Sequence, residues 1–436
     1  MNRAVSAFLA KHDFPRHVDI NTVIDALLFD MNSGIGGHPS DEDMIRTWCN
    51  PPEERMTGKS VIVIDAGGTN FRSCLVTFDA AGAVDISLLK KTAMPGVERE
   101  LGRKEFFDSI AGNLEHLKDR ADSIGFCFSY PMTITDDGDG ILIGFSKEVK
   151  APEVVGCRIG ACLEEALIEH GWKKPRKITL LNDTVAALLA GAACPDAGCR
   201  YSSYIGLILG TGLNTAYIQP PVSGRKDFPA QIVVCESGKF SHLVRSDFDK
   251  AVDSRTVKPG TFLMEKQCSG AYLGPVASEI LHTAAGEHLF SDSFCTRLLS
   301  TAALTLREMD AFLHAPYDTG SVLGTACAEV ATAEDYDCLF RILDAVVERS
   351  ARYTASMLAA CVLQSGKGTD ASRPVCILCN GTTFHKTYRI SSRVEGYLDD
   401  VLVRQRGLYY ELIARENDIT LGAAIAGLLE RKKQVF

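Results

Sequence analysis

Short apolar runs that end in glycines and small polar residues recur along this chain. Residues 61–64 are wholly apolar and β-branched, which predicts a strand buried on both faces. A second apolar run, residues 73–78, follows almost at once. The polar stretch between them is too short to hold a helix. The pattern therefore predicts strand, tight turn and strand, and excludes the strand, turn and helix of a Rossmann or P-loop site.

The first turn carries residue types suited to binding phosphate. Gly67 and Gly68 are adjacent, so the backbone can adopt positive φ and approach a ligand closely. Exposed N–H groups beside Thr69 and Arg72 would form a concave anion site. Asp65, at the strand end, would face the Mg²⁺ that accompanies ATP, through water. An ordinary hairpin is the alternative, because Gly-Gly turns are common in hairpins.

The same pattern of strand, glycine-containing turn and strand occurs again later in the chain. Residues 204–209 form an apolar strand, Gly210-Thr211-Gly212 a small turn, and residues 215–218 the start of a returning strand. A third apolar run covers residues 232–235. Two copies of this strand-turn-strand pattern suggest two similar lobes, whose turns could hold one polyphosphate from opposite sides.

Strands and helices alternate through the remaining sequence. Helical spacing of apolar residues predicts helices at 106–117, 159–167, after Asp183, and at 261–267, 271–283, 298–312, 335–363 and from 421 onward. Further strands are predicted at 84–90, 123–129, 141–145, 178–181 and 375–379. The first sixty residues read as helical and then irregular. The alternation predicts an α/β protein.

Composition and charge narrow the range of possible functions. At 436 residues, 46% hydrophobic and 23% charged, the chain is typical of a soluble globular protein with a sizeable core. A net charge of −9 argues against a general binder of nucleic acid or anionic membranes. No apolar run approaches transmembrane length, so we expect a cytoplasmic protein.

The fifteen cysteines support the same compartment, because an odd number scattered through apolar segments indicates reduced, buried thiols. Cys376 and Cys379 form a C-x-x-C, but they lie within one apolar run with no second pair nearby. A buried strand is favoured there over a metal or redox site.

Several polar residues follow predicted strands. Asp183 is the best candidate for a general base, since it ends a buried strand and has Asn182 and Thr184 as neighbours. The alternative is that one of this Asn-Asp pair only caps the following helix. Six further candidates are weak alone, but most lie at strand ends, where open α/β sheets gather their ligands. They are Ser129, Ser146, Lys147, Asn214, Glu236 and Glu265.

Eight segments together resemble the hexokinase family, in its order and spacing, from about residue 60 to residue 425. They are IDAGGTNFR, FCFSYP, ILIGFSKEV, LLNDTVAALLAG, IGLILGTGLNTAYI, CESGKF, VKPGTFLMEKQCSGAYLG and LCNGTTF. The resemblance implies two ribonuclease-H-like lobes with mixed sheets flanked by helices and a cleft between them. It implies a small lobe at 60–203 with the helix at about 420–434, and a large lobe at 204–419 with residues 1–59.

The resemblance also implies roles for matching residues. Asp183 corresponds to the general base for the sugar 6-hydroxyl, and Lys147 to a catalytic cation. The implied hexose-binding residues are Ser129, Ser146, Lys147, Asn182, Asp183, Asn214, Glu236 and Glu265. The implied nucleotide-binding residues are Asp65, Gly67, Gly68, Thr69, Asn70, Arg72, Gly210, Thr211, Gly212, Gly381 and Thr382, with Asp65 at the metal. Gly381 and Thr382 belong to the adenosine-side turn.

The chain departs from the family pattern at four places. The family Glu-Trp-Gly is here Glu236-Ser237-Gly238, and Thr-Lys is Ser146-Lys147, which keeps the hydroxyl. Asp-Gly-Ser becomes Asn380-Gly381-Thr382, and the glycine-rich turn before the last helix is replaced by residues 418–422. The last two changes bear on nucleotide preference. The zinc motif of the other bacterial sugar-kinase group is absent from the sequence.

The sequence thus predicts an ATP- and Mg²⁺-dependent hexokinase that makes hexose 6-phosphate, with hexose and ATP as partners and the oligomeric state open. Two alternatives have the same fold. One is a sugar-binding regulator with reduced catalysis, and the other is an actin-like ATPase without a sugar substrate. The sugar-binding set argues against the ATPase, and Asp183, Lys147 and both phosphate turns argue against the regulator.

Overall fold

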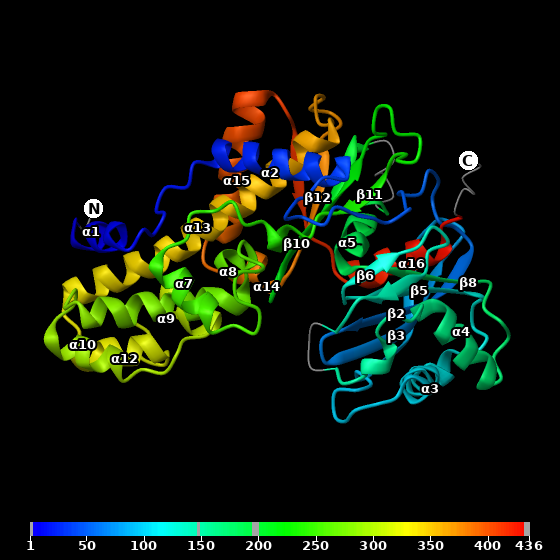
Figure 1. Ribbon diagram of the computed structural model, residues 1–436, viewed down its shortest axis with the longest axis horizontal. Coiled ribbons are helices and arrows are strands. Elements are labelled where there is room, and N and C mark those ends of the chain that lie inside the picture. Colours follow the sequence, from blue (N-terminus) through cyan, green and yellow to red (C-terminus); the bar gives the residue numbers. More distant parts are fainter. Residues whose placement is uncertain (1–2, 146–148, 194–199, 431–436) are drawn as a thin grey trace.

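The computed structural model describes residues 3–145, 149–193 and 200–430, and it has two lobes, each built on one sheet (Figure 1). The first sheet has the order β4-β3-β2-β5-β8, with β2, β3 and β4 antiparallel and β5 and β8 parallel to β2. Its strands are β2 (Lys59–Gly67), β3 (Asn70–Phe78), β4 (Val84–Ala93), β5 (Ser123–Phe128) and β8 (Lys177–Leu181). Both lobes have mixed sheets flanked by helices, so the predicted α/β class is confirmed.

Successive residues of β2 point to opposite faces of the sheet, so this lobe has two hydrophobic cores, one on each face. Ile62 and Ile64 pack on the face covered by α3 (Arg103–Asn113) and α4 (Ile159–Glu169). Val61 and Val63 point to the opposite face, against α16 (Asp418–Leu428). Since successive strand residues point to opposite faces, the all-apolar run predicted a strand covered on both sides. A small ribbon, β6 (Met132–Ile134) and β7 (Gly140–Leu142), lies beside this sheet, with the short helical turns η1 (Glu115–Leu117) and η2 (Pro152–Val154).

The second sheet has the order β1-β11-β10-β9-β12-β13, with β12 parallel to both of its neighbours and the other pairs antiparallel. The strands are β1 (Ile45–Arg46), β9 (Ser203–Leu209), β10 (Leu213–Gln219), β11 (Gln231–Val234), β12 (Val375–Asn380) and β13 (Tyr410–Ile413). The helices α2 (Ile20–Gly36) and α13 (Ala333–Ser365) share the core of one face with Ile205 and Leu207.

Helices extend the second lobe well beyond its sheet. The long helix α13 leads away from the sheet to a helical group, at the left of Figure 1. That group contains α7 (Asp247–Ser254), α8 (Glu265–Cys268), α9 (Gly270–Gly286), α10 (Asp292–Leu299), α11 (Leu306–His314) and α12 (Val322–Val330). The remaining elements are α1 (Arg3–Lys11), η3 (Ser237–Lys239), α14 (Thr382–Lys386), α15 (Ile390–Leu398) and the π-turn η4 (Asp399–Arg404).

Two helices lie between the sheets and join the lobes. α5 (Asp183–Ala192) packs on β9 and β12, α16 packs on β2 and β5, and the two helices contact each other. Glycine permits this close approach. A methyl group on Gly206 would lie 2.3 Å from the backbone oxygen of Thr184, and one on Gly422 would lie 1.9 Å from that of Ala186.

Most predicted elements are present, and the differences have local causes. Residues 261–267 were predicted as a helix, but Phe262 has φ of 54°, so only α8 is helical there. The single predicted segment 298–312 is two helices, because Thr305 and Glu308 form a capping box that starts α11 afresh. Residues 141–145 form only the short strand β7. The short strands β1 and β13 were not predicted.

Most of the thirteen cysteines in the described part of the chain are buried thiols. Cys376 and Cys379 are both buried in β12, as the apolar run predicted. Within the described residues, no helix is long and apolar enough to cross a membrane.

Candidate active site

The first predicted phosphate turn is shorter than the sequence suggested. β2 continues through Gly67 and β3 begins at Asn70, so the turn itself is Gly68-Thr69, with Gly68 at φ of 65°. Asp65 and Arg72, on either side of this turn, lie on the two strands. As cross-strand partners they are held 3.7 Å apart between Arg72 Nη1 and Asp65 Oδ2.

Three neighbours fix the conformation of this turn. The Tyr130 hydroxyl donates to the backbone oxygen of Gly68 at 2.9 Å, and the Met94 N–H donates to that of Thr69 at 3.0 Å. Ser129 adjoins the strand end, because a methyl group on Gly67 would lie 3.2 Å from its hydroxyl oxygen. The sugar candidate Ser129 and the first phosphate turn are therefore in contact.

The second predicted turn meets the predicted adenosine-side turn. The backbone oxygen of Gly210 accepts from the Gly270 N–H and the Thr383 hydroxyl, both at 2.8 Å. Gly381 has φ of 119°, and a side chain there would collide with the backbone of Leu209. Tertiary packing thus brings residues 210–212, the start of α9 and residues 381–383 together.

The structure shows which residue of the Asn182-Asp183 pair caps the following helix. The Asn182 side chain accepts from the Thr184 N–H at 2.8 Å and is the N-cap of α5. Asp183, the first residue of the helix, keeps its carboxylate outside that cap and accepts from the Thr184 hydroxyl at 3.2 Å. Its position leaves it half-buried at the end of β8.

Asn214 and Glu236 form a reciprocal pair. The Asn214 amide donates to Glu236 Oε1 at 2.8 Å, and its carbonyl accepts from the Glu236 N–H at 3.0 Å. Asn214 lies in β10. Glu236 has φ of 59°, unusual for a residue other than glycine, and the pair stabilises that backbone.

The pKa of Glu236 is raised to about 7, chiefly by burial. The Asp43 and Asp183 carboxylates also raise it, whereas Lys239 and the Asn214 hydrogen bond lower it. Asp183 is therefore within electrostatic reach of Glu236. Such a shift in a group with ordered polar partners is typical of a functional site.

Glu265 completes this cluster. Its Oε2 accepts from the Leu213 N–H at 3.0 Å, and a methyl group on Gly212 would lie 2.8 Å from the same oxygen. Gly238 is also close, since a methyl group there would lie 3.1 Å from the Glu265 Cβ. Glu265 thus connects the second phosphate turn to the loop that carries Glu236.

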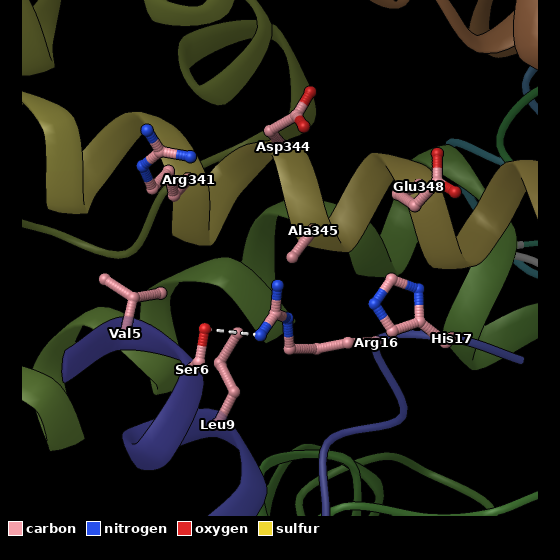
Figure 2. A pocket seen from close by; sticks show the side chains of 9 residues that line it. All are labelled: Val5, Ser6, Leu9, Arg16, His17, Arg341, Asp344, Ala345 and Glu348. Atoms are coloured by element: carbon pink, nitrogen blue, oxygen red, sulfur yellow. Dashed lines mark hydrogen bonds between the residues drawn. The ribbon is translucent and has the colours of Figure 1, made fainter. Parts of the chain in front are cut away.

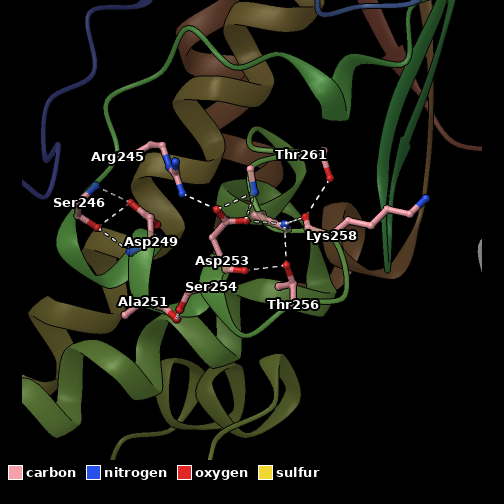
Figure 3. A network of polar contacts seen from close by, with 11 residues as sticks. Arg245, Ser246, Asp249, Ala251, Asp253, Ser254, Thr256, Lys258 and Thr261 are labelled. Carbon is pink, nitrogen blue, oxygen red and sulfur yellow. Dashed lines mark hydrogen bonds and ion pairs between the residues drawn. The ribbon is translucent and has the colours of Figure 1, made fainter.

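A buried ionic network holds α8, and with it Glu265 (Figure 3). The neighbouring Lys266 is buried, and its ammonium donates to Asp253 Oδ1 at 2.6 Å, to Thr256 Oγ1 at 2.9 Å and to the backbone oxygen of Lys258 at 2.8 Å. Arg245 donates to the other oxygen of Asp253 at 2.6 Å. Burial alone would raise the pKa of Asp253, but these hydrogen bonds hold it below its usual value.

Asp65, Asp183 and Asp418 surround one buried thiol. Burial raises the pKa of Cys127 well above its usual value, and the negative charges of these three aspartates raise it further. Cys127 also lies 3.8 Å from the Ser129 hydroxyl, between sulfur and oxygen. The carboxylates from the ends of β2 and β8 and from the start of α16 therefore converge at one edge of the first sheet.

Asp418 was not predicted as a site residue. Both of its oxygens accept from the Asn380 amide, at 2.8 and 2.7 Å, and burial raises its pKa. The signal available in the sequence was that Asn380 and Asp418 occupy two of the four places where the chain departs from the family pattern. The structure shows that these two departures are partners.

The catalytic candidate Lys147 and the sugar-binding candidate Ser146 lie outside the described residues. A cavity of about 200 Å³ lies elsewhere, between the N-terminal residues and α13, and contains none of the predicted site residues (Figure 2). There Arg16 donates to Ser6 at 2.5 Å, while Glu348 accepts from Arg352 at 2.8 Å. The first pair lies within the N-terminal residues and the second within α13. Arg352 joins the two parts by donating to the backbone oxygen of Val18 at 3.1 Å.

Comparison with known proteins agrees with this geometry. Residues 5–193 and residues 204–429 match two family models, each described as hexokinase. The chain belongs to the hexokinase family. Members of this family transfer a phosphoryl group from ATP to a hexose. Relatives of this hexokinase include Hexokinase-1 of Schizosaccharomyces pombe, 27% identical over 95% of this chain and 88% of that protein. Hexokinase-5 of Oryza sativa subsp. japonica is 28% identical over 87% of this chain and 80% of that protein.

The fold of the solved hexokinases is the same. The structure of hexokinase from Schistosoma mansoni complexed with glucose superposes with a TM-score of 0.80, at 23% identity over 98% of this chain and 99% of that chain. A second crystal structure of hexokinase gives a TM-score of 0.79 at 20% identity. The predicted family and its two-lobed α/β fold are confirmed.

Proposed function

We propose that this hexokinase transfers the γ-phosphoryl group of ATP to the 6-hydroxyl of a hexose, with glucose as its substrate. The position of Asp183 carries the proposal. It is close enough to Glu236 to raise that pKa, and it shares the surroundings of Cys127 with Asp65. Asp183 thus lies between the polar cluster suited to a sugar and the turn suited to phosphates.

Asp183 would act as the general base. Phosphoryl transfer through a loose transition state needs positioning and charge neutralisation more than covalent chemistry. A carboxylate that accepts the hydroxyl proton late contributes typically about 10²–10⁴-fold. The helix cap supplied by Asn182 holds the Asp183 backbone, so that its carboxylate is oriented before substrate arrives.

The hexose would bind between Ser129, Asn182, Asn214, Glu236 and Glu265, together with Ser146 and Lys147. A hexose presents only hydroxyls, so its site needs amides and carboxylates in a fixed array. The reciprocal Asn214–Glu236 bonds and the Leu213–Glu265 bond supply such an array. An analogue lacking a hydroxyl would leave a buried polar group unpaired, which provides discrimination.

ATP would lie across the two turns, with Asn70 and Arg72 beside the first and Gly381 and Thr382 beside the second. Lys147 and Arg72 would neutralise charge on the phosphates. The donors near the first turn are carboxylate and hydroxyl oxygens, which suit Mg²⁺. Asp65 would hold that ion through water, and the ion would neutralise charge on the polyphosphate.

We further propose the domain division of residues 60–203 with the C-terminal helix, and 204–419 with residues 1–59. Closure of the lobes on bound sugar would exclude water, which competes with the hexose as a nucleophile. A cytoplasmic location is proposed from the mostly buried cysteine thiols.

A coupled assay with ATP, Mg²⁺ and glucose tests the proposal. We expect ADP formation that requires the sugar and yields hexose 6-phosphate. Sugar binding without turnover would instead indicate the regulator, and ATP hydrolysis indifferent to sugar would indicate the ATPase. Steady-state kinetics with glucose, mannose, fructose and glucosamine would then rank the hexoses.

Replacing the base gives the sharpest single variant. Asp183→Asn should lower turnover by roughly 10²-fold or more, while glucose binding stays within about tenfold, because the amide keeps the shape but cannot accept the proton. Calorimetric glucose titration and turnover measure the two effects. Asp25→Asn, an exposed carboxylate on α2, is the control and should leave both unchanged. Near-normal turnover in Asp183→Asn would refute the assignment.

A further inference from the structure

Three consecutive acidic residues, Asp41, Glu42 and Asp43, lie against the loop that carries Glu236; we call them the acidic segment. The Asp41 carboxylate accepts from the Ser241 N–H at 2.7 Å. Glu42 hydrogen-bonds the Ser237 side chain, and Asp43 pairs with Lys239. Each member thus contacts a different residue of the loop from 237 to 241.

The acidic segment is itself anchored from the opposite side. Both oxygens of Asp30, buried in α2, accept backbone N–H groups, from Asp41 and Glu42, each at 2.9 Å. Immediately after the segment, Ile45 pairs with Val234 at the edge of the second sheet. The segment therefore joins α2 to the end of β11, which leads directly into Glu236.

Glu42 is the unusual member of the segment. Its residue exposure is 1%, and its Oε2 has no hydrogen-bond partner among the groups of the described residues. Burial raises the pKa of Glu42 well above its usual value, the nearby Cys235, Asp30 and Asp41 raise it further, and only Ser237 lowers it. The Lys239 ammonium contacts Asp43 instead, and the His242 ring lies 3.7 Å from the Asp41 carboxylate.

Ser237 also contacts the second sheet, through Thr215 of β10. Its hydroxyl lies 2.5 Å from the Thr215 hydroxyl, which also accepts from the Cys361 thiol at 3.6 Å. Thr215 follows Asn214, the partner of Glu236. Glu42, Ser237 and Thr215 thus form one buried polar chain next to the Asn214–Glu236 pair, since Thr215 and Ser237 each follow a member of that pair in the sequence. Ser237 stands where the family pattern has Trp, so a bulky apolar side chain is replaced here by a hydrogen-bonding one.

We infer that Glu42 is a positioning residue for the hexose site, which through Ser237 holds Glu236 in the left-handed conformation that presents its carboxylate to sugar. The inference rests on the proposed function for the role of Glu236. A residue other than glycine at φ of 59° is strained, and such strain persists only where surrounding contacts impose it. The acidic segment supplies those contacts from the side opposite Asn214.

The test compares Glu42→Leu with Glu42→Gln in the full-length chain. Glu42→Leu should raise the hexose KM, and the hexose Kd by calorimetry, about tenfold, because one positioning hydrogen bond is lost. The KM for ATP should stay within about twofold, since the phosphate turns are untouched. Glu42→Gln keeps a neutral hydrogen-bonding group and should restore the hexose KM to within about threefold of the wild type.

Stability separates positioning from a merely structural role. The melting temperature of Glu42→Leu should equal or exceed that of the wild type, because an apolar group replaces a buried carboxyl with an unpaired oxygen. If Glu42→Leu does not fold, Ser237→Ala removes the other half of the contact and should raise the hexose KM similarly. A hexose KM and Kd unchanged in Glu42→Leu, or in Ser237→Ala, would overturn the inference.

The charges of Asp43 and Lys239 supply a second readout, because they act oppositely on the pKa of Glu236. The hexose KM should rise at acidic pH as Glu236 is protonated. Asp43→Asn should move this rise to lower pH, and Lys239→Gln should move it to higher pH. Two unmoved profiles would contradict the role of the segment. Wild type that binds hexose without phosphorylating it would overturn the proposed function, and the Kd values would still test Glu42.

Discussion

At the scale of single residues, the surroundings of a side chain determine its hydrogen bonds and its pKa. Asn182 and Asp183 are neighbours of similar shape, yet the Asn182 side chain caps α5 whereas the Asp183 carboxylate lies outside that cap. Glu236 and Glu265 are both glutamates at the sugar cluster, and burial with two nearby aspartates raises the pKa of Glu236 to about 7. This raised pKa arises from the surroundings of Glu236, since its side chain is that of an ordinary glutamate.

This pKa predicts a pH dependence of sugar binding. Hexose hydroxyls donate to the ionised carboxylate, so protonation of Glu236 competes with hexose. Because the pKa is raised to about 7, Glu236 is half ionised near pH 7 and almost fully ionised only above about pH 8. The hexose KM should therefore rise about tenfold between pH 8 and pH 6, with the KM for ATP far less affected. Steady-state kinetics across that range measure it, and a flat hexose KM would contradict it.

At the scale of elements, a helix of four residues depends on ion pairs for its position. α8 is too short to be stable alone, and its residue Lys266 is held by Asp253 and by groups of the loop between α7 and α8. The two buried charges need each other, because removing one leaves the other desolvated and uncompensated. Glu265, the preceding residue, takes its position from this arrangement.

Lys266→Met should accordingly lower the free energy of unfolding by about 3 kcal/mol and raise the hexose KM. Denaturant unfolding and kinetics measure the two effects. Lys250→Met is the matched control, because Lys250 forms an exposed pair with Asp247 at 3.1 Å, for which a change below about 1 kcal/mol is expected. Equal stability of Lys266→Met and wild type would show that the network does not support α8.

At the scale of the whole molecule, α5 and α16 form the layer between the sheets (Figure 1). Gly422→Val should destabilise the protein by about 1–3 kcal/mol, because its side chain would meet the backbone of α5. Gly396→Ala is the control: it lies in α15 with open space around it, and alanine should stabilise that helix by about 0.5–1 kcal/mol. Calorimetric melting measures both, and an unchanged melting temperature for Gly422→Val would contradict the tight contact.

Much of this fold follows from local patterns. The apolar runs at 61–64 and 204–209, each followed by glycines and a returning strand, predicted both hairpins because alternation and turn chemistry are properties of a few adjacent residues. The short strands β1 and β13 were missed because two to four residues carry too little pattern. β1 exists only through its pairing with β11, nearly two hundred residues away in the chain.

The sequence by itself determined the α/β class, the two strand-turn-strand units and the residue types available for phosphate and sugar. Tertiary structure alone decided that Asp418 meets Asn380, that Glu42 contacts Ser237, and that the pKa of Glu236 is about 7. The physical reason is that turns and strands depend on neighbours along the chain, whereas burial and charge depend on everything nearby in space. Asp43, Asp183 and Lys239 act together on Glu236 only after folding has brought both lobes together.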